Sequence, residues 1–583
     1  MTMMLNLQGI NKEFGETNVL KDISLNISLG DRIGLVGING AGKSTLANII
    51  YGSIKCDGGN MLWYKKDIEI GYLKQDSFYC QRTWDGQEID IKVHGSREDY
   101  LEVSSYLGLK KIDAMEEERL RNLSGGEKMK MALANIWSLN PDFLILDEPT
   151  NHLDYQGMQW LIEELKKYKG TILIISHDRY FLDSCVNKIF EINKGTVTVF
   201  YGNYSFYKEE KRKRYESQLH QYEIQENTKA KIEQEINRLK EWSDKAHRDS
   251  TKKEAAGIGK KEYFRKKAKK KDKQVKSRIK SLEKIDLDGV EKPEEDKKID
   301  FKFNEAALKK NRVVEAKDIK KSFNSEVLFK DTCFFIMSGE RVGVFGGNGC
   351  GKSTLLKILL GKESLDEGDL FISSAMTIGY LSQETLDIDG DKTVIELFEI
   401  NSREEEGKIR ILLANMGFDE KMINQPLSTL SLGEVTRVRM TKIIYKHQDI
   451  LVLDEPLNHL DIYSREKLEE ALKGYEGTII LVSHDRYMLE KICNCLLVFE
   501  NNKIKKIIGS PKEYLDGLFT KNKNQDKKKM QNEKEIKEQK MLLENQIAYV
   551  LGEFSKVSQG TLIYDELDNK FKELINRKRE LGK

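Results

Sequence analysis

The sequence predicts an α/β protein in which two copies of one domain are joined by a long antiparallel helical hairpin and followed by a C-terminal helical extension. The first observation is an internal repeat. GINGAGKST begins at Gly37 and GGNGCGKST at Gly346, and LDEP and SHDRY recur later in the same order, at offsets of 307 to 309 residues. The second is the alternation of short apolar runs with helix-like runs inside each copy, which is typical of α/β domains. The third is a heptad-like spacing of apolar residues between the copies. Whole motifs repeated in one order indicate duplicated domains.

We place the first copy at residues 1–203, the helical hairpin linker at 204–310, the second copy at 311–515 and a C-terminal helical hairpin at 516–583. A length of 583 residues suits roughly three or four domains at about 150 residues each. The C-terminal hairpin is predicted from a Lys-rich tail with an apolar stripe at helical spacing. That stripe consists of Leu543, Ile547, Leu551, Phe554, Leu567, Phe571 and Leu574.

Composition excludes several classes of protein. A hydrophobic fraction of 39% supports globular cores, but no run approaches the roughly 18–20 apolar residues that a membrane-spanning helix needs. The N-terminus lacks the basic-then-apolar order of a signal peptide. Seven scattered cysteines without metal-ligand spacing indicate reduced thiols. We therefore expect a cytoplasmic protein, with any membrane channel supplied by another chain.

Both copies contain a glycine-rich phosphate-binding loop. Each loop follows an apolar strand and precedes a helix-like run, which is the context that the motif requires. Its glycines let backbone N–H groups surround phosphate oxygens at a helix N-terminus, its lysine reaches the β- and γ-phosphates, and its serine ligates Mg²⁺. The predicted ATP-binding residues are Gly37, Asn39, Gly40, Gly42, Lys43, Ser44 and Thr45 in the first copy and Gly346, Asn348, Gly349, Gly351, Lys352, Ser353 and Thr354 in the second.

An Asp-Glu pair closes a buried-strand run in each copy. Asp147 and Asp454 are predicted to lie beside Mg²⁺ at the carboxyl end of the strand. Glu148 and Glu455 are the candidate catalytic bases, because a carboxylate there can polarise a water for in-line attack on the γ-phosphate.

The remaining motifs decide the family. Leu123-Ser-Gly-Gly-Glu127 and Ser431-Leu-Gly-Glu434, together with the loops, the Asp-Glu pairs and the NHLD tetrads, resemble the full motif set of the ATP-binding-cassette (ABC) family over about four-fifths of the chain. The two copies are thereby identified as cassette 1 and cassette 2. The resemblance implies further ATP contacts from Ser124, Gly125, Gly126, Glu127, Ser431, Gly433 and Glu434, adenine stacking by Phe14 and Phe323, catalytic γ-phosphate contacts from His177 and His484, and Mg²⁺ ligation by Ser44, Gln75, Asp147, Ser353, Gln383 and Asp454.

The resemblance also implies that the cassettes face each other head to tail and clamp two ATP molecules between them. ATP on Lys43 would then be capped by Ser431 and Gly433 of cassette 2, and ATP on Lys352 by Ser124 and Gly126 of cassette 1. One residue departs from the pattern: Leu432 stands where the first glycine of the signature is expected. A side chain there would alter the approach of the signature helix, so we expect the site on Lys43 to be the slower of the two.

The linker is strongly basic. Residues 251–280 contain fourteen Lys or Arg and three acids, although the whole chain is balanced at 97 basic and 95 acidic residues. Such one-signed density favours binding to a phosphate backbone, although a solvated helix face is the alternative. Aromatic residues near the tip could stack on bases or equally pack the end of the hairpin. The predicted tip and RNA-binding residues are Trp242, Lys252, Lys253, Gly257, Ile258, Gly259, Lys260, Lys261, Tyr263, Phe264 and Arg265.

Two fused cassettes with a long basic linker resemble the ABC-F family of ribosome-associated ATPases. Gln75 to Ser124 spans 49 residues and Gln383 to Ser431 spans 48, which leaves no room for the extra arm of housekeeping members. The chain is therefore similar to the antibiotic-resistance type of Gram-positive bacteria. That resemblance implies a monomer that binds the tRNA exit site of the 70S ribosome, contacts 23S rRNA and P-site tRNA, and relieves inhibition by lincosamides, pleuromutilins and streptogramins A.

Three alternatives remain. A housekeeping ABC-F factor would rescue stalled ribosomes without meeting a drug. The ATPase subunit of a transporter would bind membrane proteins, and a DNA-acting cassette ATPase would carry far longer coils that interrupt a single head. Here each cassette has its own complete motif set.

Overall fold

The computed structural model describes most of the chain. The described residues are 2–65, 67–74, 79–82, 88–90, 132–133, 141–151, 153–251, 258–293, 311–323, 326–382, 391–400, 402–446, 448–458, 460–518, 574 and 577. The predicted C-terminal hairpin therefore lies almost entirely outside the described residues. Within the described part, no helix is both long enough and apolar enough to cross a membrane.

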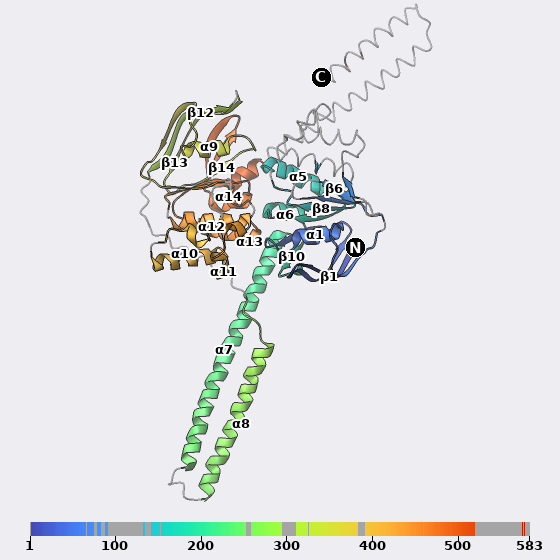
Figure 1. The fold of residues 1–583 in the computed structure, drawn as a ribbon, viewed down its shortest axis with the longest axis vertical. Coiled ribbons are helices and arrows are strands. Elements are labelled where there is room, and N and C mark those ends of the chain that lie inside the picture. Colours follow the sequence, from blue (N-terminus) through green and yellow to red (C-terminus); the bar gives the residue numbers. More distant parts are fainter. Residues whose placement is uncertain are drawn as a thin grey trace, which may run out of the picture.

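Cassette 1 is built on a central, mainly parallel sheet beside a smaller antiparallel one (Figure 1). The central strands are fully buried apolar runs such as Phe143–Asp147 and Thr171–Ile175, as expected for parallel strands covered on both faces. The central order is β11(Thr196–Tyr201), β10(Lys188–Asn193), β3(Arg32–Gly37), β9(Thr171–Ile175), β8(Phe143–Asp147), β5(Ile70–Leu73), β6(Tyr79–Arg82) and β7(Glu88–Asp90). The antiparallel sheet has the order β2(Thr17–Ser28), β1(Met3–Phe14) and β4(Gly58–Trp63).

Helices cover both faces of the central sheet of cassette 1. Helix α1(Lys43–Tyr51) packs between the two sheets, where Leu46, Ile49 and Ile50 join a buried apolar cluster with residues of both. Helices α5(Tyr155–Lys167) and α6(Arg179–Cys185) cover the opposite face. Each is capped by an aspartate that accepts a hydrogen bond from its first turn, as N-capping requires.

Cassette 2 repeats this plan. Its central sheet has the order β16(Ile378–Leu381), β17(Ile450–Asp454), β18(Thr478–Val482), β14(Arg341–Phe345), β19(Cys495–Glu500) and β20(Lys503–Ile508), and its antiparallel sheet the order β13(Glu326–Met337), β12(Arg312–Phe323) and β15(Glu367–Ile372). Its helices are α9(Lys352–Leu359), α10(Arg403–Asn415), α11(Glu420–Ile423), α12(Leu432–Tyr445), α13(Ile462–Gly474) and α14(Arg486–Ile492), with 3-10 turns at Ile395–Leu397 and Leu427–Thr429. The tandem α/β architecture predicted from the repeat is thereby confirmed.

The linker forms two long helices that project from the cassettes (Figure 1). Helix α7(Tyr204–Thr251) has 48 residues and α8(Ile258–Asp288) has 31, so the two helices of the hairpin are unequal in length. At 1.5 Å per residue they are about 72 and 46 Å long. Lys229 pairs with Asp286 at 2.6 Å, and the chain leaves α8 where Val290 N donates to Gln225 at 2.7 Å. The part of α7 nearest the cassettes therefore extends beyond its pairing with α8.

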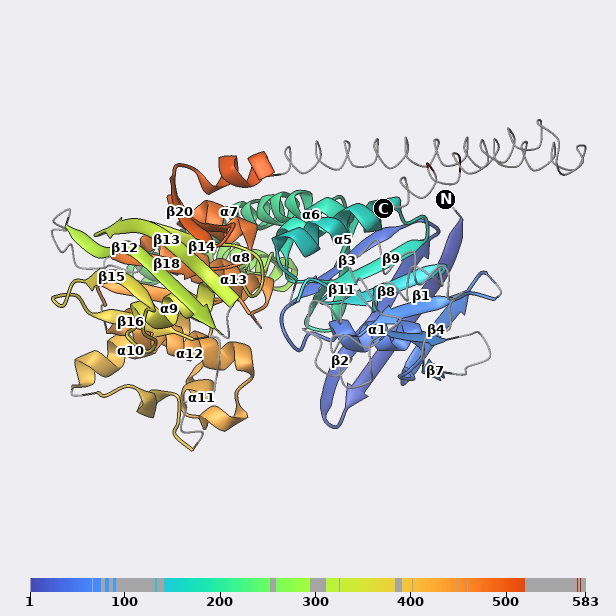
Figure 2. The same ribbon diagram turned by 90° about the horizontal axis from the view of Figure 1, so that it is seen from above.

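The two cassettes lie side by side, with α5 and α6 of cassette 1 facing α13 and α14 of cassette 2 (Figures 1 and 2). One buried cluster contains residues of both cassettes, and the rings of Tyr155 and Phe345 meet across the boundary at 5.5 Å. The carboxyl ends of β8 and β17 therefore approach the opposite cassette, which positions the candidate sites described below.

Candidate functional site

The phosphate-binding loops have the same geometry in both cassettes. Gly42 and Gly351 stand directly before α1 and α9 in the left-handed conformation, with φ of 99° and 103°, which glycine adopts without strain. Lys43 Nζ donates to the carbonyls of Gly37 and Ile38 at 2.8 and 2.9 Å. Lys352 Nζ makes the matching pair of bonds to Gly346 and Gly347. Each ammonium is thus held, nearly buried, inside its loop.

A carboxylate and a hydroxyl lie together beside each loop. Burial raises the pKa of Asp147, although hydrogen bonds from the Ser44 and Tyr72 hydroxyls oppose that rise. Asp454 is likewise buried, with a raised pKa that the hydrogen bond from Ser353 opposes. A buried carboxylate and a serine hydroxyl are hard oxygen donors of the kind that Mg²⁺ prefers. The pairs that sequence motifs assigned to the metal are therefore adjacent in space.

Each strand end presents a buried glutamate in a strained conformation. Glu148 and Glu455 have positive φ values of 49° and 47°, which are rare for a residue with a side chain. Burial raises the pKa of Glu148 to about 7 and that of Glu455 to about 8. Both Oε1 atoms are buried without a hydrogen-bond partner among the described residues. Such strain and such unpaired buried atoms cluster at functional sites.

A histidine faces each glutamate. His177 Nε2 lies 3.4 Å from Glu148 Oε1, and His484 Nε2 lies 3.7 Å from Glu455 Oε1. Burial lowers the pKa of His177 well below its usual value and that of His484 to about 4. Both imidazoles are therefore neutral near pH 7 and can donate one hydrogen bond while accepting another.

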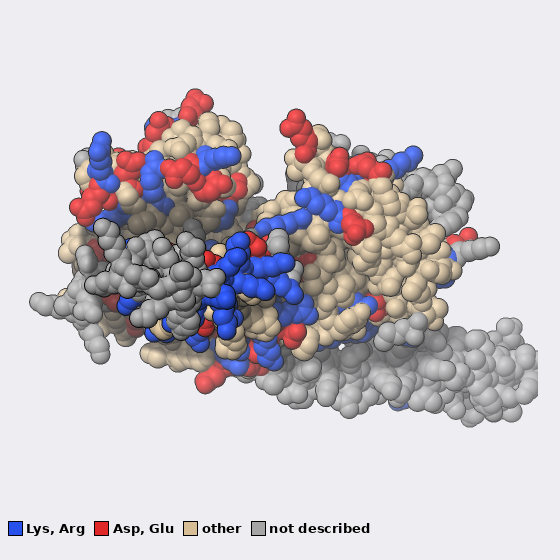
Figure 3. All heavy atoms as spheres, turned by 90° about the horizontal axis from the view of Figure 1, so that it is seen from below, with Lys and Arg blue, Asp and Glu red and all other residues tan. Residues whose placement is uncertain are grey.

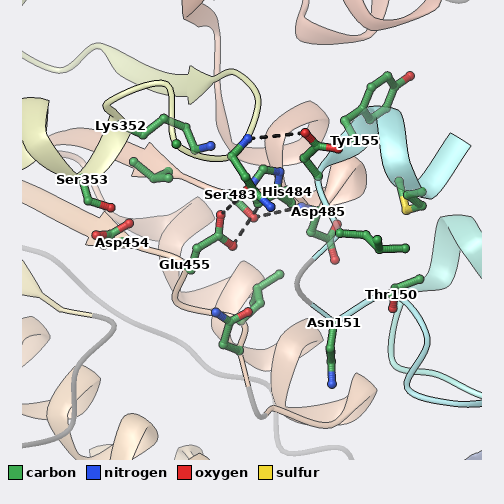
Figure 4. A pocket seen from close by; sticks show the side chains of 18 of the residues that line it. Thr150, Asn151, Tyr155, Lys352, Ser353, Asp454, Glu455, Ser483, His484 and Asp485 are labelled. Carbon is green, nitrogen blue, oxygen red and sulfur yellow. Dashed lines mark hydrogen bonds and ion pairs between the residues drawn. The ribbon is translucent and has the colours of Figure 1, made fainter. Parts of the chain in front are cut away.

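The site on Lys352 forms a cavity of about 690 Å³ that is lined by both cassettes. Figure 4 shows Lys352, Glu455 and His484 of cassette 2 on one side, and Thr150, Asn151 and Tyr155 of cassette 1 on the other. A volume of this size lies within the usual range for small-molecule sites. The cavity supports the predicted arrangement in which one cassette covers the nucleotide site of the other.

One aspartate from each cassette contacts the phosphate-binding loop of the other cassette. Asp461 caps α13 through Oδ1, which accepts from Ser464 N at 2.7 Å, and its Oδ2 accepts from Asn39 N of cassette 1 at 3.0 Å. Asp154 caps α5 in the same way, and its Oδ2 lies 3.4 Å from Asn348 N of cassette 2. Each cassette therefore places the aspartate of its NHLD tetrad against the phosphate-binding loop of the other, while the capping of ATP by the signature residues stays a prediction. The sequence marked both NHLD tetrads but did not reveal this second use of their aspartates.

The candidate adenine-stacking rings each have a lysine behind them. Phe14 and Phe323 end β1 and β12 and are 49% and 46% exposed, which leaves a ring face free for a base. Lys12 Nζ lies 5.4 Å from the first ring centroid, and Lys321 Nζ lies 4.9 Å from the second. Sequence motifs did not mark these lysines, although each stands two residues before its phenylalanine in both cassettes.

Several predicted residues lie outside the described part of the chain. They are Gln75, Gln383, Ser124, Gly125, Gly126 and Glu127. In cassette 2, Ser431 caps α12 and forms a reciprocal capping box with Glu434, while Gly433 is buried in the first turn. Helix α12 begins at Leu432, the residue that departs from the motif. The expected inequality of the two sites stays a prediction.

The structure describes only some of the predicted linker-tip residues. Trp242 is 57% exposed on α7, with Lys271 Nζ of α8 5.3 Å from its ring centroid. The tip residues Lys252, Lys253 and Gly257 lie outside the described residues, and for Ile258, Gly259, Lys260, Lys261, Tyr263, Phe264 and Arg265 only the helical backbone of α8 is described. Trp242 therefore does not pack inside the hairpin.

Comparisons with known proteins show the family of the chain. Residues 20–151 and 329–458 match the family described as ABC transporter, and residues 190–303 match a second model with the same description. The ribosome protection protein VmlR of Bacillus subtilis is 37% identical, with 100% of this chain and 99% of that protein covered. ABC transporter F family member 2 of Arabidopsis thaliana is 32% identical, covering 88% of this chain and 78% of that protein.

Solved structures agree on the fold alone. The RNase-L inhibitor superposes with a TM-score of 0.55 at 20% identity, over 86% of this chain and 90% of that one. A crystal structure of archaeal aABCE1 in complex with ribosomal stalk protein aP1 gives the same score. Two complete cassettes, full-length similarity and the catalytic geometry together make this chain an ATP-hydrolysing member of the ABC transporter family, in the ABC-F branch that includes VmlR.

Proposed function

We propose that this chain binds the ribosome in its ATP-closed form and uses the end of its linker to relieve inhibition by antibiotics of the large subunit. The single observation that carries the proposal is the full-length similarity to a protein named for ribosome protection. The charge of the linker and the geometry of the two ATP sites support it independently.

The ATP sites supply the chemistry. Ser44 with Asp147, and Ser353 with Asp454, would hold Mg²⁺, which neutralises charge on the β- and γ-phosphates. Lys43 and Lys352 bind the same phosphates. Glu148 and Glu455 each orient a water and accept its proton as the water oxygen attacks phosphorus, and the neutral histidine beside each one contacts the γ-phosphate.

Closure depends on nucleotide because groups from both cassettes surround each site. With ATP present, its γ-phosphate adds contacts to those that Asp461 and Asp154 already make across the boundary. Hydrolysis and phosphate release remove those contacts, which favours opening. The linker joins the cassettes and would follow this cycle.

The linker has the electrostatic character of an RNA-binding arm. Within the described residues 266–280 of α8, nine side chains are Lys or Arg and one, Asp272, is acidic. All nine except Lys271 are exposed. Figure 3, which looks at the hairpin end-on, shows Lys and Arg gathered at the centre of this face. Such a stripe suits the phosphates of 23S rRNA or P-site tRNA, and the exposed Trp242 ring offers a surface for stacking on a base.

Ribosome binding is tested with a Glu148→Gln/Glu455→Gln variant of the full chain, which should retain ATP. We expect this variant with MgATP to co-sediment with bacterial 70S ribosomes, and the unmodified chain with ADP to stay in the supernatant. A triple Lys266→Gln/Lys269→Gln/Lys273→Gln change should weaken binding. It should also make the slope of log affinity against log salt concentration shallower, by the amount expected for the loss of up to three phosphate contacts. A control with Lys330, Lys421 and Lys512 changed to glutamine, all exposed on cassette 2, should bind normally.

Drug relief is tested separately in a cell-free translation reaction. Added protein should restore translation blocked by a lincosamide, a pleuromutilin or a streptogramin A. If the protein binds ribosomes but restores translation with none of the three drugs, the resistance role is refuted and a housekeeping factor is favoured. Absence of ribosome binding by the ATP-trapped variant would refute the whole proposal.

A further inference from the structure

Four helices meet where the linker leaves cassette 1. They are α6 of cassette 1, α13 and α14 of cassette 2, and the first two turns of α7, residues 204–211, which we call the linker root. Figures 1 and 2 both place the start of α7 next to α6 and α13. Most residues at this junction lie outside the sequence motifs, but α6 begins at Arg179 of the SHDRY motif, two residues after His177.

A buried ion pair crosses from one cassette to the other at this junction. Arg179 on α6 makes two hydrogen bonds to the carboxylate of Glu469 on α13, one of them 3.1 Å long from Nη1 to Oε2. The Glu469 side chain is fully buried, and that of Arg179 is 5% exposed. Lys491 of α14 also donates to Glu469 at 2.9 Å. A two-pronged pair of this kind has fixed geometry, and breaking it leaves a buried charge without its partner.

The linker root is tied to the same two helices. Glu466, one turn before Glu469 on α13, accepts from Lys208 of the root and lies 3.8 Å from Arg179. On the other side, Asp183 of α6 accepts from both Ser205 N and Ser205 Oγ, at 2.8 and 2.6 Å. The root is therefore held by cassette 1 through α6 and by cassette 2 through α13. A shift of one cassette against the other must strain or break one set of these bonds.

The repeat offers an internal comparison, because Glu469 has no acidic counterpart at the matching position of cassette 1. The position that matches Glu469 in cassette 1 is Ile162, a buried apolar residue. The arginine that matches Arg179 is Arg486, which instead pairs with Glu490 of α14 and with Asp516, the first residue after cassette 2. Each arginine does lie over a tyrosine of the other cassette, at 5.2 and 5.0 Å from the ring centroids. The stacking is thus shared by both cassettes, whereas the cross-cassette ion pair belongs to the His177 side alone.

We propose that Arg179 and Glu469 are a positioning pair that couples the ATP site on Lys43, through His177 and α6, to the position of the linker root. When ATP brings cassette 2 onto this site, Glu469 approaches Arg179, the start of α6 is held, and Asp183 and Glu466 clamp the root between them. When the cassettes separate, the pair breaks and the root is released. At the position of cassette 1 that matches Glu469 the residue is the apolar Ile162, so the same arginine–carboxylate pair does not form there, and the two ATP sites act unequally on the linker.

This inference rests on ATP hydrolysis by the chain and not on ribosome binding. It predicts a role beyond stability, because the linker root should respond to nucleotide only while the pair is intact. A purely structural ion pair would instead affect the root equally with and without nucleotide.

The test is amide hydrogen exchange of the full chain in the Glu148→Gln/Glu455→Gln background, with and without MgATP. With the pair intact, we expect MgATP to slow exchange of amides in the linker root by at least tenfold. In an Arg179→Met/Glu469→Met variant the slowing should fall below threefold, while amides 38–45 of the loop stay protected by ATP. The double change is chosen because replacing both buried charges with apolar side chains of similar size usually preserves folding, whereas removing one does not.

Arg486→Met is the matched control, because it removes the corresponding arginine without touching the cross-cassette pair. Unlike Glu469, its partners Glu490 and Asp516 are 20% and 55% exposed, so water can solvate them when the arginine is removed. We expect it to keep at least a tenfold slowing at the linker root. Undiminished slowing in the double variant would overturn the inference, as would an equal loss in the Arg486→Met control. The experiment contains no ribosomes, so its outcome does not depend on the proposed function.

Discussion

Asp461 accepts two backbone hydrogen bonds at once, and a change to asparagine should show how much the bond across the cassette boundary contributes to ATP use. Its Oδ1 accepts from Ser464 N at the start of α13, and its Oδ2 accepts from Asn39 N in the phosphate-binding loop of cassette 1. Asparagine has only one side-chain carbonyl oxygen. Whichever way the amide is turned, one N–H group loses its acceptor and faces an NH₂ group instead.

The expected size of the effect follows from that loss. An N–H group left without its acceptor costs about 1–2 kcal/mol, which corresponds to about 5- to 30-fold in an equilibrium constant. If the bond to Asn39 is lost, the ATP concentration for half-maximal turnover should rise by that factor. If the amide turns the other way, α13 loses its cap, which costs about 1 kcal/mol and lowers Tm by a few degrees.

Phosphate release measured across a range of ATP concentrations, together with calorimetry, distinguishes these outcomes. Asp154→Asn is the matched control, because its cross-cassette contact to Asn348 is 3.4 Å long and correspondingly weak. We expect its half-saturating ATP concentration to rise by about threefold or less. An Asp461→Asn protein with unchanged half-saturation and unchanged Tm would refute the reasoning, and so would a larger effect of Asp154→Asn on ATP use.

Three further predictions concern single residues. Gly42→Ala should lower Tm more than Gly40→Ala. Both glycines have positive φ, but only a Cβ on Gly42 would meet other atoms closely, at 2.7 Å from Leu20 Cδ2 and 2.8 Å from Val19 Cγ1. Equal losses of Tm in calorimetry would contradict this. Lys321→Met should raise the half-saturating ATP concentration several-fold with little change in maximal turnover, because it removes the cation behind Phe323; a fall in turnover alone would count against it. Without nucleotide, Glu148→Gln should raise Tm at pH 8 but hardly at pH 4.5. Because the pKa of the buried Glu148 carboxyl is raised from 4.5 to about 7, the protein loses about 3 kcal/mol of its free energy of unfolding as the pH rises through that range. An equal gain in Tm at both pH values would contradict this prediction.

Much of the fold was predictable because its signals are local. A loop such as Gly37–Ser44 needs glycine where the backbone turns left-handed, and a strand such as β8 needs an unbroken apolar run where both faces are covered. These requirements act within a few residues, so they can be read without tertiary contacts. Duplication reinforced them, since each motif occurred twice in the same order. Helix lengths in the linker were less predictable, because α7 continues past its pairing with α8 to reach the cassettes.

The sequence alone therefore determined the two cassettes, their phosphate-binding loops, their Asp-Glu pairs and the basic linker, because each depends on local residue order. Only the tertiary structure decided which groups from one cassette face the sites of the other. Asp461 and Asn39 are 422 positions apart in the chain, and Arg179 and Glu469 are 290 apart. No local pattern marks such pairs: their bonds exist only when two separately folded domains meet in one orientation. The asymmetry of the junction has the same origin, because Arg179 and Arg486 occupy matching positions but only Arg179 meets a glutamate, Glu469, from the opposite cassette, whereas Arg486 pairs with Glu490 and Asp516.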